Sequence, residues 1–405
     1  MSRNILQSID PLLIGERIAE ARRGRGLTQA DLAQSLGVAR TTVTAMEKGE
    51  RRPRAIELAR IAAILNSSAR RFVEPPGTKD TPSFLIFFRR RMADHGPALA
   101  RDIGTFQQMC AWYVELEGRL GEPLPRRYPP VYEIGETEPN RAADEVATSE
   151  RNRLGLGDGP IADVWGLLET DIGLRLVEFP MSDTSIAGMV LFTESLGGCV
   201  AINAKHPPAR QRWTAIHEYA HFLVDRDQAE VTVLRKRSRL PRSERFADAF
   251  ASSFLMPAPG LIRKFEGLRR AKSEGITPSD VLALAHHYAV SFDAMMIRLE
   301  SLNLLPGGTR EYLKERGFRP DEGKELLGLA IEERYDIGPR RYLTLCAQAH
   351  QAGFLSEGEV AEHLGLSLVD ARDAVQRILS QSDVSLDGEW VQGSLDLTTS
   401  MLPAG

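Results

Sequence analysis

One stretch of the chain predicts how its larger part folds: Arg212-Trp213-Thr214-Ala215-Ile216-His217-Glu218-Tyr219-Ala220-His221. We expect a helix over 209–225, in which each residue turns by about 100° and positions four apart share one face. His217 and His221 can therefore present imidazole nitrogens to one metal ion, and Glu218 can take a proton from a water held by that metal. Two unrelated histidines on a solvated helix would give the same pattern, so the flanking sequence has to decide.

A second helix, predicted to begin at Ser243 as its N-cap, supplies the acids that such a site needs. Zinc held by two histidines requires a third protein ligand, with the fourth position left to water. We expect Glu244 to be this ligand for Zn²⁺ and Asp248, one turn further on, to hydrogen-bond a ligating histidine. Two alternatives stay open: Asp248 is the ligand and Glu244 lies outside, or both are ordinary surface acids.

Composition places the chain among cytoplasmic globular proteins. Its 405 residues are enough for two or three domains. The three cysteines, Cys110, Cys199 and Cys346, are far apart and form no C-x-x-C pair, which argues against a disulfide framework and fits a reducing cytosol. No run of about 18 apolar residues is present, so we expect no membrane partner.

Charge separates a basic head from an acidic body. The chain carries a net charge of -4, yet residues 1–71 hold thirteen Arg and Lys against seven Asp and Glu, a net charge of +6. The remainder is therefore at -10. This asymmetry indicates that only the head meets a polyanion.

The head, residues 1–72, is predicted to be an all-α helix-turn-helix domain. Glycines and a threonine cap divide it into five short helices, at 14–23, 29–36, 39–48, 55–65 and 69–72. The third helix would enter the major groove by its N-terminal end, with Val43 and Met46 turned inward. Base or phosphate contacts are expected from Arg40, Thr41, Thr42 and Thr44. Phosphate contacts are expected from Gln29, Arg51, Arg52 and Arg54. The alternative is a bare helical bundle with a solvated basic face.

The rest of the chain is divided into three regions. Residues 73–139 are expected to be a linker and helical connector. Residues 140–300 should form an α+β zincin-like metallopeptidase domain with strands at 174–179, 187–192 and 199–203. Either 199–203 or 187–192 should be the sheet edge that holds a substrate chain in extended form. The basic loop 226–242 is either a flap or a solvated loop. Residues 301–405 should be a helical extension, and its acidic pair at 357–364 and 368–379 suits protein contact.

Two segments resemble known families. Leu27 to Ala33, Gly37 to Val43 and Met46 to Gly49 resemble the phage-repressor-like (XRE) helix-turn-helix family. Arg212 to His221, followed by Glu244-x-x-Ala247-Asp248-x-Phe250-Ala251-x-x-Phe254-Leu255-Met256-Pro257, resembles the ImmA/IrrE metallopeptidase family over about 140–300. That family often has Asn where Asp248 stands here, which is a mild departure.

The resemblances imply a mixed fold and two coupled activities. The head would bind operator DNA, usually as a homodimer. The body would be a zinc metalloendopeptidase that cleaves a repressor or another partner protein, with Glu218 as the base. The alternative is a non-catalytic regulator or antitoxin whose zincin-like domain senses a ligand or binds a partner toxin.

Overall fold

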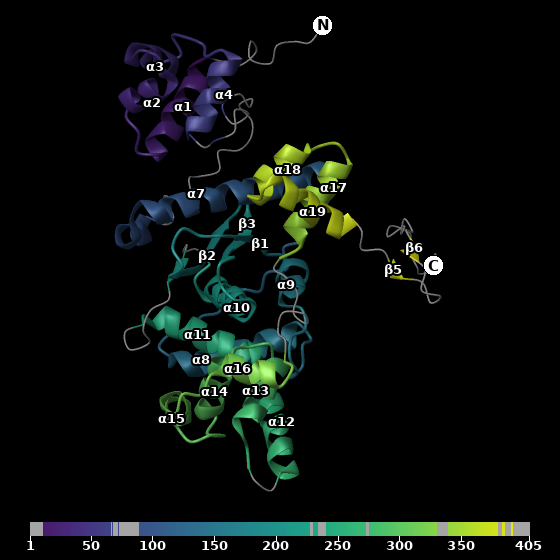
Figure 1. The fold of residues 1–405 in the computed structure, drawn as a ribbon. Helices are drawn as coiled ribbons and strands as arrows, with labels where there is room; N and C mark the ends of the chain where they lie inside the picture. Colours follow the sequence, from purple (N-terminus) through teal and green to yellow (C-terminus); the bar gives the residue numbers. More distant parts are fainter. Residues whose placement is uncertain are drawn as a thin grey trace. The chain divides into compact units, whose positions relative to one another are not determined.

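The structure is a computed structural model, and it describes most of the chain. The described residues are 11–65, 67, 72, 89–226, 230–233, 240–272, 275–329, 339–379, 383–384 and 390–391. They belong to two compact units, one within Met1–Thr81 and the other within Pro82–Gly405. Each unit is described by itself (Figure 1).

The N-terminal unit is a helical bundle around one apolar core. Its described helices are α1 (Pro11–Gly24), α2 (Gln29–Leu36), α3 (Arg40–Glu47) and α4 (Ala55–Leu65). Thr28 and Asp31 cap α2 reciprocally, and Gly37 ends α2 at a φ of 70°, which favours glycine. Val43 and Met46 are buried as predicted. The predicted fifth helix at 69–72 lies outside the described residues except for Phe72.

The second unit is built on a small mixed sheet. Its strands are β1 (Arg175–Phe179), β2 (Ile186–Thr193), β3 (Gly197–Asn203) and β4 (Glu230–Val233), in the spatial order β1-β3-β2-β4. β1 runs parallel to β3, whereas β2 is antiparallel to both β3 and β4.

This order corrects the expected sheet edge. Neither β3 nor the paired part of β2 is an edge, because β3 lies between β1 and β2, and β4 covers β2 from Ile186 to Val190. β4 comes from the segment 226–242, which was expected to be a loop throughout. The other part of that prediction, at 227–229 and 234–239, lies outside the described residues.

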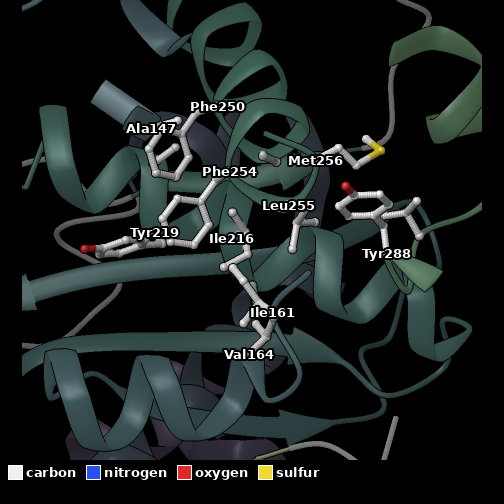
Figure 2. Close-up of a cluster of buried hydrophobic side chains, with 14 of the residues drawn as sticks. Ala147, Ile161, Val164, Ile216, Tyr219, Phe250, Phe254, Leu255, Met256 and Tyr288 are labelled. Atoms are coloured by element: carbon white, nitrogen blue, oxygen red, sulfur yellow. The ribbon is translucent and has the colours of Figure 1, made fainter. Parts of the chain in front are cut away.

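One face of the sheet packs on the helices that carry the candidate metal ligands. Val190, Val200 and Ile202 belong to this core. Its helices include α8 (Pro139–Arg153), α10 (Pro208–Val224) and α11 (Arg242–Leu255). Tyr219 of α10 and Phe250 and Phe254 of α11 lie together in it (Figure 2). α11 begins at Arg242 with Pro241 at the N-cap position, so the prediction of Ser243 as N-cap was wrong.

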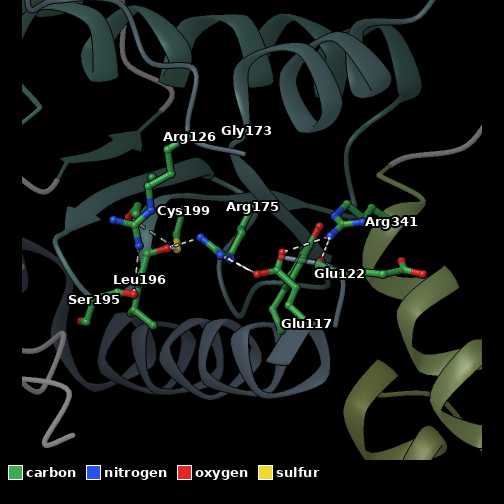
Figure 3. Close-up of polar contacts among 12 residues, drawn as sticks. Glu117, Glu122, Arg126, Gly173, Arg175, Ser195, Leu196, Cys199 and Arg341 are labelled. Atoms are coloured by element: carbon green, nitrogen blue, oxygen red, sulfur yellow. Dashed lines mark hydrogen bonds and ion pairs between the residues drawn. The ribbon is translucent and has the colours of Figure 1, made fainter. Parts of the chain in front are cut away.

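The opposite face of the sheet packs on α7 (Arg89–Leu120) and α17 (Arg341–Gln351), which come from the two ends of the unit. α18 (Glu357–Leu364) and α19 (Leu368–Leu379) pack on α17 and belong to the same core. The three cysteines all lie buried in this second core. A buried ion pair joins Glu117 of α7 to Arg175 of β1 at 2.5 Å, and Arg341 of α17 adds a third charge at 3.4 Å from Glu117 (Figure 3). Segments predicted as a connector and a separate extension thus share one core.

The remaining described elements surround the first core or follow the second. They are α9 (Val164–Gly166), the π-helix η2 (Leu167–Ile172), α12 (Ala258–Ala271), α13 (Pro278–His287), α14 (Phe292–Ser301), α15 (Thr309–Glu315), α16 (Pro320–Leu326), β5 (Asp383–Val384) and β6 (Trp390–Val391). The mixed fold class is therefore as predicted, with an all-α N-terminal domain and an α+β body. No described helix is long and apolar enough to cross a membrane.

Candidate metal centre

The helix α10 is fixed in rotation by contacts on the side away from its histidines. Tyr219 donates its hydroxyl to Oε2 of Glu150 at 2.5 Å, and Tyr132 donates to Oε1 at 2.7 Å. Arg153 neutralises the same carboxylate at 2.7 Å. The Glu150 side chain is fully buried, so these donors satisfy a charge that would otherwise be unfavourable inside the protein. Residues 217 and 221 consequently point towards α11.

Three side chains gather their donor atoms at this point. One ligand atom each from His217, His221 and Glu244 lies within 4.8 Å of the others. The two Nε2 atoms are 3.3 Å apart, and Glu244 lies 3.4 Å from Nε2 of His217 and 3.6 Å from Nε2 of His221. Both histidines are buried. Two imidazoles and one carboxylate in this arrangement could hold a metal ion with a position left open.

Asp248 lies on the other nitrogen of His217. Nδ1 of His217 donates to Oδ1 of Asp248 at 3.1 Å, which leaves Nε2 facing Glu244 and His221. Glu244 therefore lies next to the Nε2 atoms of both histidines, whereas Asp248 contacts the opposite edge of the His217 ring. A carboxylate in that place orients a ligating imidazole and makes it more basic.

The acids around His217 change its pKa and that of Glu244. Burial lowers the pKa of His217, but the hydrogen bonds with Asp248 and Glu244 outweigh burial and raise it to about 10. Burial raises the pKa of Glu244, yet the hydrogen bond and charge of His217 lower it overall. The two carboxylates thus favour a positive charge at this point of the site, which is the charge that a bound cation would supply.

Glu218 lies between the helix and β2. Its side chain is fully buried. A Cβ placed on Gly188 of β2 would stand 2.7 Å from Oε1 of Glu218 and 2.7 Å from Cγ2 of Thr214. The carboxylate therefore needs a glycine on the strand beside it. Sequence reasoning missed this residue, although a glycine inside a strand pattern signals a close approach of this kind.

The predicted DNA-contacting residues lie on α2, on α3 and after α3. Arg40, Thr41 and Arg54 are exposed. Gln29 and Thr44 are half-buried and bonded to each other, because the Gln29 carbonyl accepts from Thr44 at 3.1 Å while the Gln29 amide donates to Glu47 at 2.8 Å.

The other three predicted positions are partly buried: Thr42, Arg51 and Arg52. Arg51 pairs with Glu57 at 2.7 Å. α2, the glycine turn and α3 thus present a helix-turn-helix whose second helix begins with exposed residues that could face DNA.

A helix-turn-helix unit and a sheet-backed His/Glu site define a DNA-binding chain with a candidate metal centre. Comparisons with known families agree with this class. Residues 18–72 match the family model described as helix-turn-helix, and residues 169–300 match the one described as the IrrE N-terminal-like domain, a peptidase family. The predicted fusion is confirmed: this chain joins a helix-turn-helix DNA-binding domain to an IrrE/ImmA-like domain.

Comparisons with whole proteins add little. No curated protein matches the chain. Two solved structures are similar at low identity: Bacillus thuringiensis PlcR in complex with the peptide PapR7 and DNA, at 12% identity, and ComR from Streptococcus suis, at 11%. Both alignments cover 91% of this chain and 94% of the other, with TM-scores of 0.17 and 0.16. At these TM-scores neither structure bears on the architecture described above.

Proposed function

We propose that this protein is a cytoplasmic DNA-binding regulator whose second unit is a zinc-dependent endopeptidase. The observation that carries the proposal is the convergence of His217, His221 and Glu244, with Glu218 buried beside them and a strand next to the site. The match to a peptidase family supports the same reaction class.

The donor set fits Zn²⁺. Zinc in catalytic sites takes three nitrogen or oxygen ligands from the protein, and two histidines with one glutamate are such a set. His217 and His221 would bind through Nε2 and Glu244 through a carboxylate oxygen. Bound there, zinc would polarise a scissile carbonyl and make a water more acidic.

Glu218 would move the proton in the reaction. Its carboxylate would take a proton from the attacking water and then deliver it to the leaving amine, so that one residue serves as base and acid in turn. Asp248 would keep His217 in the tautomer that frees Nε2. Burial of Glu218 keeps bulk water away from this transfer.

The N-terminal unit suggests what the peptidase would control. We propose that it binds operator DNA as a homodimer, with Arg40, Thr41, Thr42 and Thr44 at base edges or phosphates. Gln29, Arg51, Arg52 and Arg54 would contact phosphates. The cleaved protein would be a repressor or another regulatory partner rather than bulk protein.

The test compares full-length Glu218→Gln with wild type and with Glu145→Gln, which makes the same change on the exposed side of α8. Zinc content is measured by mass spectrometry, and cleavage is followed on proteins encoded beside this gene. We expect wild type and Glu145→Gln to bind zinc and cleave, and Glu218→Gln to bind zinc without cleaving. Cleavage by Glu218→Gln would refute the mechanism. Zinc binding without cleavage by wild type would instead favour the non-catalytic regulator or antitoxin.

A further inference from the structure

The strand β4 lies where a peptide substrate would be expected. Zincin-type peptidases hold a substrate chain extended along the sheet edge beside the metal helix. In this chain β2 is the strand beside Glu218, because the carboxylate lies against Gly188. The position next to β2 is filled by the chain's own Glu230–Val233, which pairs antiparallel with it.

The register places one residue of β4 at the candidate catalytic face. Thr232 stands opposite Gly188, and Val231 stands opposite Met189. Val231 and Met189 both lie in the core on the α7 side of the sheet. Side chains alternate along a strand, and directly opposed residues share a face. The side chain of Thr232 therefore points to the sheet face that packs on α10. A side chain at Gly188 would point to the same face.

The fit of β4 in this place is imperfect. Thr232 is buried, yet its hydroxyl has no hydrogen-bond partner among the described residues. The register also shifts between Ile186 and Gly188, so Ala187 is left out of the ladder with β4. Bulges of this kind are common next to active sites. A buried hydroxyl without a partner is unfavourable for a purely structural strand.

Distance argues against a substrate bound on the outer side of β4. Neighbouring strands lie about 4.8 Å apart, so a chain beyond β4 would run about 10 Å from β2. The position of β4 itself is one strand spacing from Gly188, and Glu218 lies against that residue. Only a chain in the place of β4 has its backbone next to the candidate base.

We propose that β4 occupies the place of a polypeptide substrate on β2, so that the chain covers its own active site. The inference rests on the proposed peptidase function. The substrate is then an extended segment that pairs antiparallel with β2 and carries a small or β-branched residue opposite Gly188. Cleavage requires β4 to leave β2, which makes the pairing an autoinhibitory contact.

A disulfide across the two strands tests whether β4 must leave. Opposed residues of an antiparallel pair have Cα atoms about 4.5–5.5 Å apart, within the range that a disulfide spans. Met189→Cys with Val231→Cys is made in full-length protein that also carries Glu218→Gln, so that binding is read without hydrolysis. Peptide mapping verifies the bond, since Cys110, Cys199 and Cys346 are also present.

The probe is a fluorescein-labelled peptide with the sequence of residues 228–235, measured by fluorescence anisotropy with zinc present. The oxidised protein should not bind it, and reduction should restore binding. Equal affinity in the oxidised and reduced protein would overturn the inference.

A second variant, Val231→Asp, should release β4, because a carboxylate would be buried among apolar residues at this position. Its matched control is Val369→Asp, at an exposed site on α19. If β4 is displaced in only about a tenth of the molecules, its release raises the apparent peptide affinity about tenfold. Unchanged affinity in a folded Val231→Asp protein would count against the inference. If this variant unfolds, the disulfide alone decides.

Restoring Glu218 separates this inference from the proposed function. If Val231→Asp binds the peptide but cleaves no partner, the proposed peptidase function is refuted and the inference about β4 stands. If the oxidised and reduced disulfide variants cleave equally, the inference about β4 is refuted and the peptidase function stands.

Discussion

Zinc binding to His217 should release a proton that can be counted. The carboxylates of Asp248 and Glu244 raise the pKa of this histidine to about 10 despite its burial, so the ring is protonated at neutral pH in the metal-free protein. A zinc ion needs the lone pair on Nε2, and each binding event must therefore expel at least one proton. Affinity should rise about tenfold per pH unit, or about 30-fold from pH 6.5 to 8.0.

Isothermal titration calorimetry in buffers of different ionisation enthalpy measures this release directly. Asp248→Asn is the comparison, because asparagine keeps the size and a hydrogen-bond acceptor but removes the charge. The pKa of His217 should fall in this variant, so fewer protons should leave at pH 8.5 than in wild type. Zinc binding by wild type without proton release would refute the reasoning, as would equal release by the two proteins.

Three further expectations follow from the same structure. In Gly188→Ala the new Cβ collides with Glu218, so the protein should lose cleavage but keep its zinc content, measured in parallel. Full cleavage activity would show that the Glu218 carboxylate can move aside. Arg22→Met leaves the buried carboxylate of Glu47 without its cation and should destabilise the N-terminal unit by about 3 kcal/mol. Calorimetry should show a lower unfolding temperature for this unit, and an unchanged temperature would contradict the expectation. The pKa of His217 in the folded protein lies above its unfolded value of about 6.5, so the free energy of unfolding of metal-free protein should fall by about 1.4 kcal/mol per pH unit from about pH 6.5 to 10. Denaturant melts that show no such fall would contradict the assigned pKa.

Local patterns in the sequence were sufficient for several helices and for the composition of the candidate site. The boundaries of α2 and α18 were predicted to the residue, because capping residues and a following glycine mark both ends. The gathering of His217, His221 and Glu244 was also predictable, since the histidines are fixed by helical spacing and the glutamate by its place on the next helix.

Strand pairing was beyond the reach of the same reasoning. Glu230–Val233 alternates over only four residues within a basic stretch, so nothing local distinguishes it from a loop. Its partner on β2 is some forty residues away in sequence, and the register depends on which faces can be buried. The charge cluster of Glu117, Arg175 and Arg341 was unpredictable for the same reason, because each residue alone looks like an ordinary surface charge.

The strand β3 contributes side chains to both cores of the second unit. Val200 and Ile202 face α10, whereas Cys199 and Ala201 face the core that contains α7. Adjacent residues of one strand point to opposite faces. Neighbouring residues of β3 therefore contact the core that contains α7 and the core that contains the metal helix α10. A close-packed interior transmits small shifts rather than absorbing them. Within the second unit, a shift of α7 should therefore reach α10 and its histidines through β3.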